Sequence, residues 1–187
     1  MKLSEKVSGI QPSATLAVVT KVVKMKEHGE KVISFGAGEP DFETPDFIKD
    51  AAIKAIKNGK THYTPIGGVT ELRKAVAKKF KDENNIEYLP EEIVVSNGAK
   101  HSLTNAIEAV VNPGDEVILS SPYWVSYSEM IKLAKGIPVF VETKFNEGFL
   151  LKAEDVEKKI TDKTKAIIIN SPSNPTGCVM GYEELIS

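Results

Sequence analysis

The chain has 187 residues, of which 41% are hydrophobic, and a net charge of −2, so it is long enough for one domain with its own core. No apolar stretch reaches the roughly 18–20 residues that span a bilayer, and the first residues lack the pattern of a signal peptide. The charge balance gives no sign of a nucleic-acid partner. Cys178 is the only cysteine, which excludes an internal disulfide. We expect a cytoplasmic globular protein. Its content of lysine and glutamate is typical of thermophiles.

Amphipathic helices are predicted in the first half of the chain, because apolar side chains recur there at near-helical spacing. Their ranges are 13–29, 46–59 and 69–85. Gly29 and Gly59 mark the ends of the first two helices. The segment 31–45 is predicted to begin as a short strand, over 31–35, and to run into glycine and turn residues, and the segment 61–68 is predicted to be a loop.

After residue 90, short apolar segments alternate with helical ones. The four predicted strands cover 92–98, 112–122, 137–143 and 164–170, and the three predicted helices between them cover 99–111, 123–136 and 153–161. Strands that alternate with helices favour a parallel sheet joined by crossover connections. We therefore predict an α/β fold with a mostly parallel sheet flanked by helices.

Three of the predicted strands end in small polar residues. These ends are Ser96-Asn97-Gly98, Ser120-Ser121-Pro122 and the segment 170–177. In an open parallel sheet, ligands bind beyond the carboxyl ends of the strands. The apolar run AIII therefore breaks off into NSPSNPTG because this end of the strand forms the floor of a binding site.

Several residues near these ends are candidates for ligand contact. Gly98, Ala99 and Lys100 stand where a helix begins, and the free N–H groups of a helix start suit phosphate, although an ordinary strand-to-helix turn has the same composition. Trp124 is the only tryptophan, and it either stacks on a flat ligand ring or fills the core. Asn174 can donate and accept hydrogen bonds to a ligand, or it can stabilise a turn.

Other common sites do not fit the sequence. Gly36 and Gly38 follow a predicted strand, but Asp41 stands where a dinucleotide-binding loop needs its third glycine, so a tight turn is the better interpretation. No HExxH or GxSxG motif is present, and Cys178 has no evident base. We therefore expect neither a metal site nor nucleophilic hydrolysis.

Taken together, these segments resemble one family. GEPDF, HYTPIGGVTELRKA, SNGAKHSL, PGDEVILSSPYWVSY and NSPSNPTG occur in this order along the chain. They are similar to the class I pyridoxal-phosphate-dependent aminotransferases of fold type I, and most closely to the bacterial aspartate aminotransferase group. The resemblance covers nearly the whole chain. It implies an N-terminal arm and the start of the small domain over 1–45, followed by the N-terminal part of the cofactor-binding large domain over 46–187.

The resemblance implies how pyridoxal 5'-phosphate would be bound. It assigns the cofactor phosphate to the loop formed by Gly98, Ala99 and Lys100, which agrees with the argument from the helix start. It assigns one face of the pyridine ring to Trp124 and the 3-oxygen of the ring to Asn174. The cofactor would take up the electrons released when an amino acid loses its alpha proton.

The substrate site and the subunit interface are implied in the same way. Gly38, with Trp124 and Asn174, would line the substrate pocket, and Tyr63 would reach the cofactor phosphate of a neighbouring subunit, which implies a homodimer. The implied reaction moves an amino group between an amino acid, with aspartate as the first choice, and a 2-oxo acid such as 2-oxoglutarate. Aromatic acids, alanine and prephenate stay open as substrates.

The resemblance also predicts what this chain lacks. In the family, the Schiff-base lysine, the aspartate on the pyridine nitrogen, a tyrosine on the 3-oxygen and the arginine that clamps the substrate carboxylate follow the part matched here. Arg73 is the only arginine, and it does not match that clamp. We therefore expect no catalytic residue in this chain, no turnover by the chain alone, and association with a complementing C-terminal half or in a non-native oligomer.

Two other functions stay open at this point. Carbon–sulfur lyases and synthases of the same fold type use a similar set of loops, and their substrates are distinguished by the half that follows. A non-catalytic module that binds the cofactor for regulation is the third possibility. Regulators of that kind carry an additional DNA-binding segment, for which the short N-terminal arm leaves no room.

Overall fold

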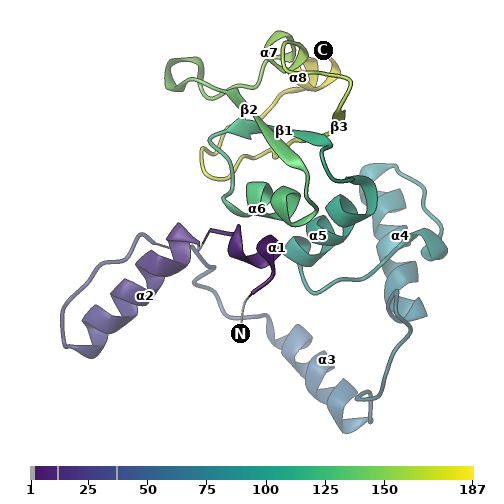
Figure 1. The fold of residues 1–187 in the computed structure, drawn as a ribbon. Helices are drawn as coiled ribbons and strands as arrows, with labels where there is room; N and C mark the ends of the chain where they lie inside the picture. Colours follow the sequence, from purple (N-terminus) through teal and green to yellow (C-terminus); the bar gives the residue numbers. More distant parts are fainter. Residues whose placement is uncertain (1–2, 12, 37) are drawn as a thin grey trace. The chain divides into compact units, whose positions relative to one another are not determined.

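Three parallel strands form the sheet of the described part of the chain, which comprises residues 3–11, 13–36 and 38–187 of a computed structural model (Figure 1). The strands are β1 (Glu116–Ser121), β2 (Ile137–Glu142) and β3 (Thr164–Ile168), and their order in the sheet is β2-β1-β3. Ile118 of β1 pairs with Val139 on one side and Ile167 on the other. The predicted α/β fold with a parallel sheet is confirmed.

Helices precede, connect and follow these strands. They are α1 (Glu5–Ser8), α2 (Ala14–Glu27), α3 (Asp46–Lys57), α4 (Thr70–Asn84), α5 (Ala99–Val110), α6 (Ser126–Leu133), α7 (Ala153–Glu157) and α8 (Tyr182–Ile186), with 3-10 turns η1 (Pro90–Glu92) and η2 (Phe145–Glu147). Each helix predicted from periodicity is present with somewhat shorter bounds. Within the described ranges, none of the helices combines the length and the apolar character that a membrane crossing requires.

Packing divides the chain into two units. The first, here called the sheet unit, comprises residues 1–17 and 100–187, and the second, the helical unit, comprises residues 18–99. The boundary between two domains that the sequence places after residue 45 is a different division, and it stays a prediction.

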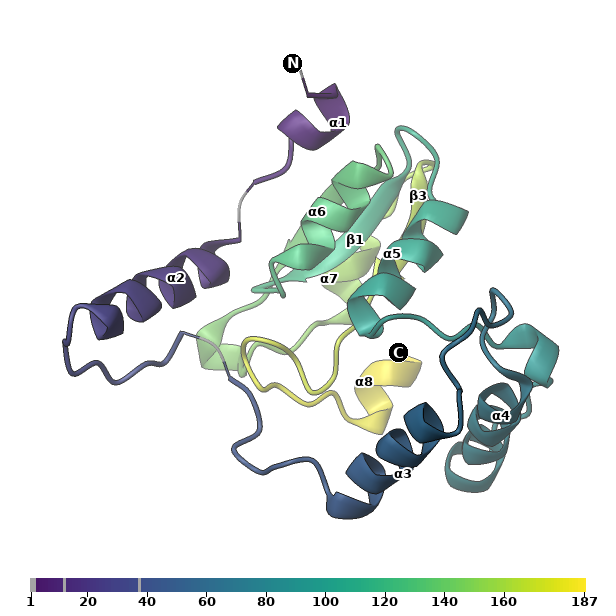
Figure 2. The ribbon, with the colours of Figure 1, turned by 90° about the horizontal axis from the view of Figure 1, so that it is seen from below.

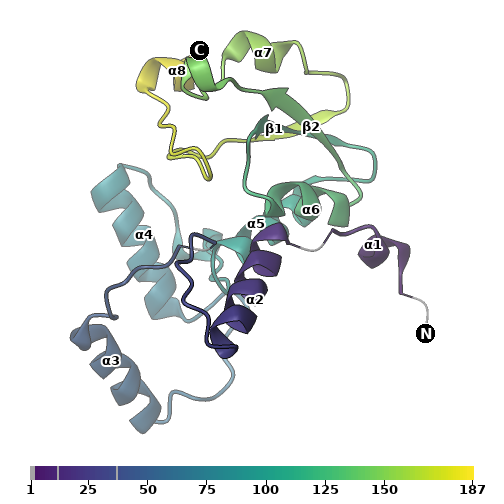
Figure 3. The ribbon, with the colours of Figure 1, turned by 90° about the vertical axis from the view of Figure 1, so that its left-hand side faces the viewer.

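The sheet unit is built in layers around β1. Figures 1 and 3 show α5 and α6 on one side of the sheet and α7 and α8 on the other. Val117, Ile118 and Leu119 of β1 are each 1% exposed, because both faces of this central strand are covered. Residue 118 faces away from its two neighbours, as the period of two in a strand requires.

The two faces of β1 belong to two separate apolar clusters. The larger cluster joins Val117 and Leu119 to the inner sides of α5 and α6, and its remaining buried members are Ile107, Val111, Tyr127, Met130, Ile131 and Ala134. The smaller cluster holds Ile118 with Val141 and Leu151. Figure 2 shows α5 and α6 running alongside β1, which is the arrangement that places their apolar sides on the sheet.

The helical unit contains less buried surface. Neither α3 nor α4 contains a buried residue. The best-defined contacts surround Arg73, whose Nε donates hydrogen bonds to the carbonyl oxygens of Pro90 (2.7 Å) and Ile93 (3.0 Å). The N–H of Val95 donates to the carbonyl of Gly67 at 2.9 Å, which holds the segment after η1 against the loop before α4.

Two predicted strands are wrong. The segments 31–35 and 92–98 are apolar and extended in pattern, but neither is a strand in the structure, and both are fully described. A strand needs a second backbone segment to accept and donate its ladder of hydrogen bonds. Val95 makes one such bond to Gly67, which is too little for a ladder.

Candidate functional site

The polar ends of β1 and β3 lie at the same edge of the sheet, as the sequence predicts. Leu119 of β1 is paired with Ile168 of β3, and the strands run parallel, so the segments that follow them leave the sheet side by side. A small cavity of about 20 Å³ between these segments is lined by Ser120, Asn170 and Thr176, among others. The third predicted strand end, Ser96-Asn97-Gly98, belongs to the helical unit and follows no strand.

The loop after β3 is held by its own side chains. The Oδ1 atom of Asn170 accepts a hydrogen bond from the backbone N–H of Asn174 at 2.9 Å, and the N–H of Gly177 donates to the carbonyl of Ser173 at 2.7 Å. Gly177 has a φ of +72°, a conformation that favours glycine. Asn170 therefore shapes the turn, whereas the carboxamide of Asn174 is exposed and makes no hydrogen bond with any described residue.

The predicted helix start after residue 98 is confirmed. Gly98 has a φ of +81° and its N–H donates to the carbonyl of Ser96, which turns the chain sharply before α5 begins at Ala99. No acidic residue lies in the first turn of α5. The first N–H groups of a helix lack acceptors within the helix and carry the positive end of its dipole, so this turn suits an anion.

Lys100 and Trp124 are brought together by the fold of the sheet unit. The Nζ atom of Lys100 lies 5.0 Å from the centroid of the Trp124 ring, within the range of a cation–π contact. The indole is half-buried against the larger apolar cluster and meets the ring of Tyr127 edge to face at 5.3 Å. Part of the Trp124 ring therefore packs on the core, and its stacking on a ligand ring stays a prediction.

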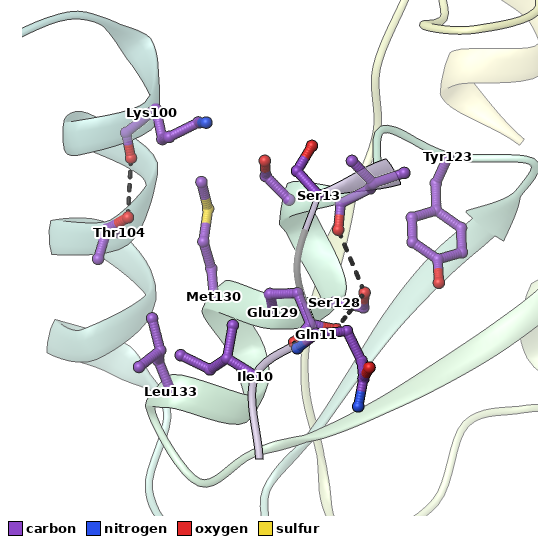
Figure 4. A pocket seen from close by; sticks show the side chains of 12 residues that line it. Ile10, Gln11, Ser13, Lys100, Thr104, Tyr123, Ser128, Glu129, Met130 and Leu133 are labelled. Atoms are coloured by element: carbon purple, nitrogen blue, oxygen red, sulfur yellow. Dashed lines mark hydrogen bonds between the residues drawn. The ribbon is translucent and has the colours of Figure 1, made fainter. Parts of the chain in front are cut away.

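A larger pocket of about 420 Å³ opens beside Lys100 within the sheet unit. Figure 4 shows Lys100 and Thr104 of α5 on one side of it and Ser13 with Gln11 on the other, with Met130 of α6 between them. The remaining lining residues come from the N-terminal segment, the turn after β1 and α6, and they are Ile10, Tyr123, Val125, Ser126, Ser128, Glu129 and Leu133. The pocket thus combines one ammonium group, several hydroxyl groups and an apolar end.

Glu129 is the carboxylate of this pocket. Its Oε2 atom accepts the backbone N–H of Gln11 at 3.1 Å, and its Oε1 atom accepts hydrogen bonds from Lys132 Nζ at 2.7 Å and Ser128 Oγ at 3.4 Å. Partial burial opposes ionisation, but the hydrogen bonds from Lys132, Gln11 and Ser128 together outweigh it and lower the pKa of Glu129. The carboxylate therefore stays charged at neutral pH.

Gly38 and Tyr63 lie in the helical unit, apart in sequence from the residues described above. A Cβ atom added to Gly38 would meet nothing within 4 Å, so the structure gives no steric reason for a glycine there. The side chain of Tyr63 is fully exposed in the loop between α3 and α4. Their assignments to the substrate pocket and to a neighbouring subunit stay predictions.

Sequence reasoning missed the residues that close the pocket on the side of the N-terminus. Ser13 could have been found, because its hydroxyl accepts the N–H of Leu16 at 3.3 Å at the start of α2, which is a helix-capping pattern. No sequence signal points to Gln11, because its backbone N–H makes the contact. Glu129 lies within an ordinary amphipathic helix and is distinguished only by its partners.

Fold and site together define an α/β protein with a parallel sheet, polar loops at the carboxyl ends of its strands and a pocket beside a helix start. The chain belongs to the aminotransferase class I and II family, whose model matches residues 30–186. It is 51% identical over 185 residues to an aspartate/prephenate aminotransferase of Nitrosomonas europaea, with 99% of this chain and 47% of that protein covered. It is 53% identical over 183 residues to a probable aspartate/prephenate aminotransferase of Aquifex aeolicus, with 98% and 46% covered.

Solved structures give the same result. An aspartate aminotransferase from Thermus thermophilus with maleate superposes with a TM-score of 0.96 at 48% identity, over 99% of this chain and 48% of that one. An aspartate aminotransferase from Thermotoga maritima superposes with a TM-score of 0.92 at 42% identity, over 98% and 49%. The chain therefore spans about half the length of the relatives that it matches.

Proposed function

We propose that this chain forms the N-terminal half of a pyridoxal-phosphate-dependent aminotransferase that moves an amino group between aspartate and a 2-oxo acid such as 2-oxoglutarate. The observation that carries the proposal is the 51% identity to an aspartate/prephenate aminotransferase over 99% of the chain. The family and these relatives imply pyridoxal 5'-phosphate as the cofactor. When bound, this cofactor supplies an electron-withdrawing ring that stabilises the charge left by a departing alpha proton.

The chemistry of the residues present fits this cofactor. The helix start at Ala99, preceded by Gly98 in a positive-φ turn and free of acidic side chains, suits a phosphate group. Lys100 adds positive charge, and Trp124 offers an aromatic ring on which a flat heterocycle can stack. The exposed carboxamide of Asn174 can donate a hydrogen bond to a ring oxygen.

Other proposed roles concern the substrate and a second subunit. Gly38 would line the pocket for the substrate carboxylate, together with Trp124 and Asn174, and Tyr63 would reach the site of a neighbouring copy in a homodimer. Arg73 is not assigned to the substrate carboxylate, because it does not match the position of that clamp in the family, and its Nε atom donates instead to two backbone carbonyls. The lysine that holds the cofactor and the arginine that binds the substrate carboxylate would then come from a complementing C-terminal half.

The first experiment compares the chain alone with a complemented protein. The chain is mixed or co-expressed with the C-terminal half of the Nitrosomonas europaea relative, and transamination of aspartate with 2-oxoglutarate is followed in the presence of pyridoxal phosphate. We expect no sustained turnover by the chain alone and clear turnover by the complemented protein. Turnover by the chain alone, or its absence after complementation with demonstrated assembly, would contradict the proposal.

The second experiment tests the cofactor site without relying on activity. Trp124 is the only tryptophan, so its fluorescence reports one place in the molecule. Pyridoxamine 5'-phosphate is the probe, because it carries the same ring and phosphate but forms no imine with surface lysines. We expect saturable quenching that weakens about tenfold in Lys100→Gln, as the loss of a charge-assisted hydrogen bond predicts. Lys78→Gln, on the exposed side of α4, is the matched control and should bind as the wild type does.

A further inference from the structure

The loop between β3 and α8 contains two asparagines that have different partners. Asn170, two residues beyond the end of β3, is half-buried, and its Oδ1 atom accepts the backbone N–H of Asn174 at 2.9 Å. Asn174 is exposed, and its carboxamide makes no hydrogen bond with any described residue. One asparagine therefore supports the backbone of the other and leaves its carboxamide available to a ligand.

This part of the loop has few backbone donors that could fix it. Two of residues 172–175 are prolines, which have no N–H, so Ser173 and Asn174 carry the only backbone donors there. The N–H of Ser173 donates to the carbonyl of Cys178 at 2.8 Å, and the loop folds back on itself (Figure 3). The N–H of Asn174 has the side chain of Asn170 as its one acceptor among the described residues. This side chain is therefore the contact that fixes the backbone from which the Asn174 carboxamide projects.

The acceptor is joined to the well-packed part of the sheet unit. Ile168, at the end of β3, pairs with Leu119 of the central strand β1 and packs against the larger apolar cluster. Asn170 follows two residues later and, with Ser120, lines the small cavity at the ends of the two strands. Because the end of β3 carries the acceptor, its hydrogen bond holds residue 174 at a fixed place relative to the sheet.

We propose that Asn170 is a positioning residue that holds Asn174 where its carboxamide meets the 3-oxygen of the cofactor ring. The cofactor part of this statement rests on the proposed function, in which the Asn174 carboxamide binds a ring oxygen. Asn170 itself touches no cofactor atom. It acts through the N–H of Asn174, so its loss should weaken recognition of the 3-oxygen and leave recognition of the rest of the cofactor unchanged.

The contact between the two asparagines is tested by hydrogen exchange on the full chain. In Asn170→Ala, the amide of Asn174 should exchange about tenfold faster than in the wild type, because its acceptor is lost. Asn170→Asp keeps an oxygen at the same place and adds a charge, so exchange should be no faster than in the wild type. Circular dichroism checks the fold of each variant. If Asn170→Ala fails to fold, Asn170→Ser replaces it, since the serine oxygen is one bond closer to the backbone and falls short of the N–H.

The matched control is Ser171→Ala, in the same loop. The Oγ atom of Ser171 also accepts a backbone N–H, but that of Met180, at 3.0 Å. This variant should speed exchange at Met180 and leave exchange at Asn174 unchanged. Equal exchange at Asn174 in Asn170→Ala and wild type, or equal acceleration in the control, would overturn the contact.

The positioning role is tested with two ligands in the protein complemented with a C-terminal half. Calorimetry gives the affinities for pyridoxamine 5'-phosphate and for 3-deoxypyridoxamine 5'-phosphate, which lacks only the ring oxygen. Asn174→Ala should reduce the preference for the ligand with the oxygen about tenfold, and Asn170→Ala should reduce it about threefold. A merely structural role of Asn170 would weaken the binding of both ligands equally and leave this preference unchanged.

The double variant shows whether Asn170 acts through Asn174. Once the Asn174 carboxamide is absent, Asn170→Ala should cause no further loss of preference, so the two effects should not add. Additive losses, or an unchanged preference in Asn170→Ala together with faster exchange, would overturn the positioning role while the proposed function stands. If the assembled, complemented wild type binds no pyridoxamine phosphate, the proposed function and the positioning role both fail, whereas the exchange data still decide whether Asn170 holds the loop.

Discussion

The sheet unit and the helical unit contain similar amphipathic helices but bury them to different extents. The most completely buried side chains, Val117, Ile118, Leu119 and Ile131, all belong to the sheet unit. In the helical unit, Ile93 is the one described hydrophobic side chain that is buried, and Phe35 is 97% exposed. An amphipathic pattern therefore predicts that a helix has an apolar side, but it does not supply the surface that covers this side.

The difference follows from the presence of a sheet. Strand β1 offers two apolar faces, and α5 and α6 on one side and Leu151 on the other cover them. The helical unit has no strand among its described residues, so α3 and α4 lack a flat partner. Its order depends more on specific contacts, such as those of Arg73 with the carbonyls of Pro90 and Ile93.

The largest expected effect is that of a cavity in the sheet unit. Ile131 is 0% exposed, so Ile131→Ala should lower the free energy of unfolding by about 2–5 kcal/mol through lost burial and the cavity left behind. Ile66 in the helical unit is fully exposed, and Ile66→Ala should change the free energy of unfolding by no more than about 0.5 kcal/mol. Equilibrium denaturation with urea measures both, and similar losses in the two variants would break the comparison between the units.

A smaller effect is expected at a turn in the helical unit. Gly68 has a φ of +101°, and an added Cβ would lie 2.6 Å from Cγ2 of Val95, so Gly68→Ala should cost about 1–3 kcal/mol in backbone strain and crowding. Gly67→Ala is the matched control, because its Cβ would meet no atom closer than 3.7 Å. Thermal unfolding followed by circular dichroism compares the two. Equal decreases of the unfolding temperature in the two variants would mean that Gly68 is not packed against Val95 as the structure shows.

The smallest effect is a pH dependence that separates a buried tyrosine from an exposed one. Burial raises the pKa of the Tyr127 phenol, because desolvation disfavours the charged form. A raised pKa contributes stability that is complete below the unfolded value of about 10 and is lost as pH rises through the folded value. Tyr127→Phe should therefore reduce the loss of stability in alkaline solution.

Tyr63→Phe is the control for this titration, since Tyr63 is fully exposed in the helical unit. Unfolding midpoints in urea at several pH values between about 8 and 11 give the measurement. We expect the Tyr63 variant to follow the wild type throughout. If both variants lost stability with pH in the same way as the wild type, the buried phenol would not be the titrating group.

Much of the fold could be predicted from the sequence. Helices α2 to α7 and the three strands follow from local periodicity and from glycine and proline at their ends. The polar ends of β1 and β3 could be assigned to one edge, because parallel strands bring their carboxyl ends together. The prediction of a strand over 92–98 failed because its apolar pattern is that of a strand, whereas the structure pairs the segment with no strand and joins Val95 to the distant Gly67 by a single backbone hydrogen bond.

The candidate site could be predicted only in part. Gly98, Trp124 and Asn174 carry recognisable local signals, namely a turn glycine before a helix, a lone indole and an amide in a proline-rich loop. Glu129 and Gln11 carry none, since a carboxylate on a helix and a backbone N–H in an arm are common features. Their hydrogen bond spans 118 residues of sequence, and no periodicity reaches that far.

The sequence by itself therefore determined the helices, the parallel sheet, the polar strand ends and membership of the aminotransferase family, because these depend on short patterns repeated along the chain. The tertiary structure alone decided which apolar segments pair as strands, that the ammonium group of Lys100 lies against the ring of Trp124, and that the carboxylate of Glu129 accepts the backbone N–H of Gln11. The physical reason is that local propensities act over a few residues, whereas strand pairing and contacts between distant side chains exist only after the backbone has brought their partners within a few ångströms.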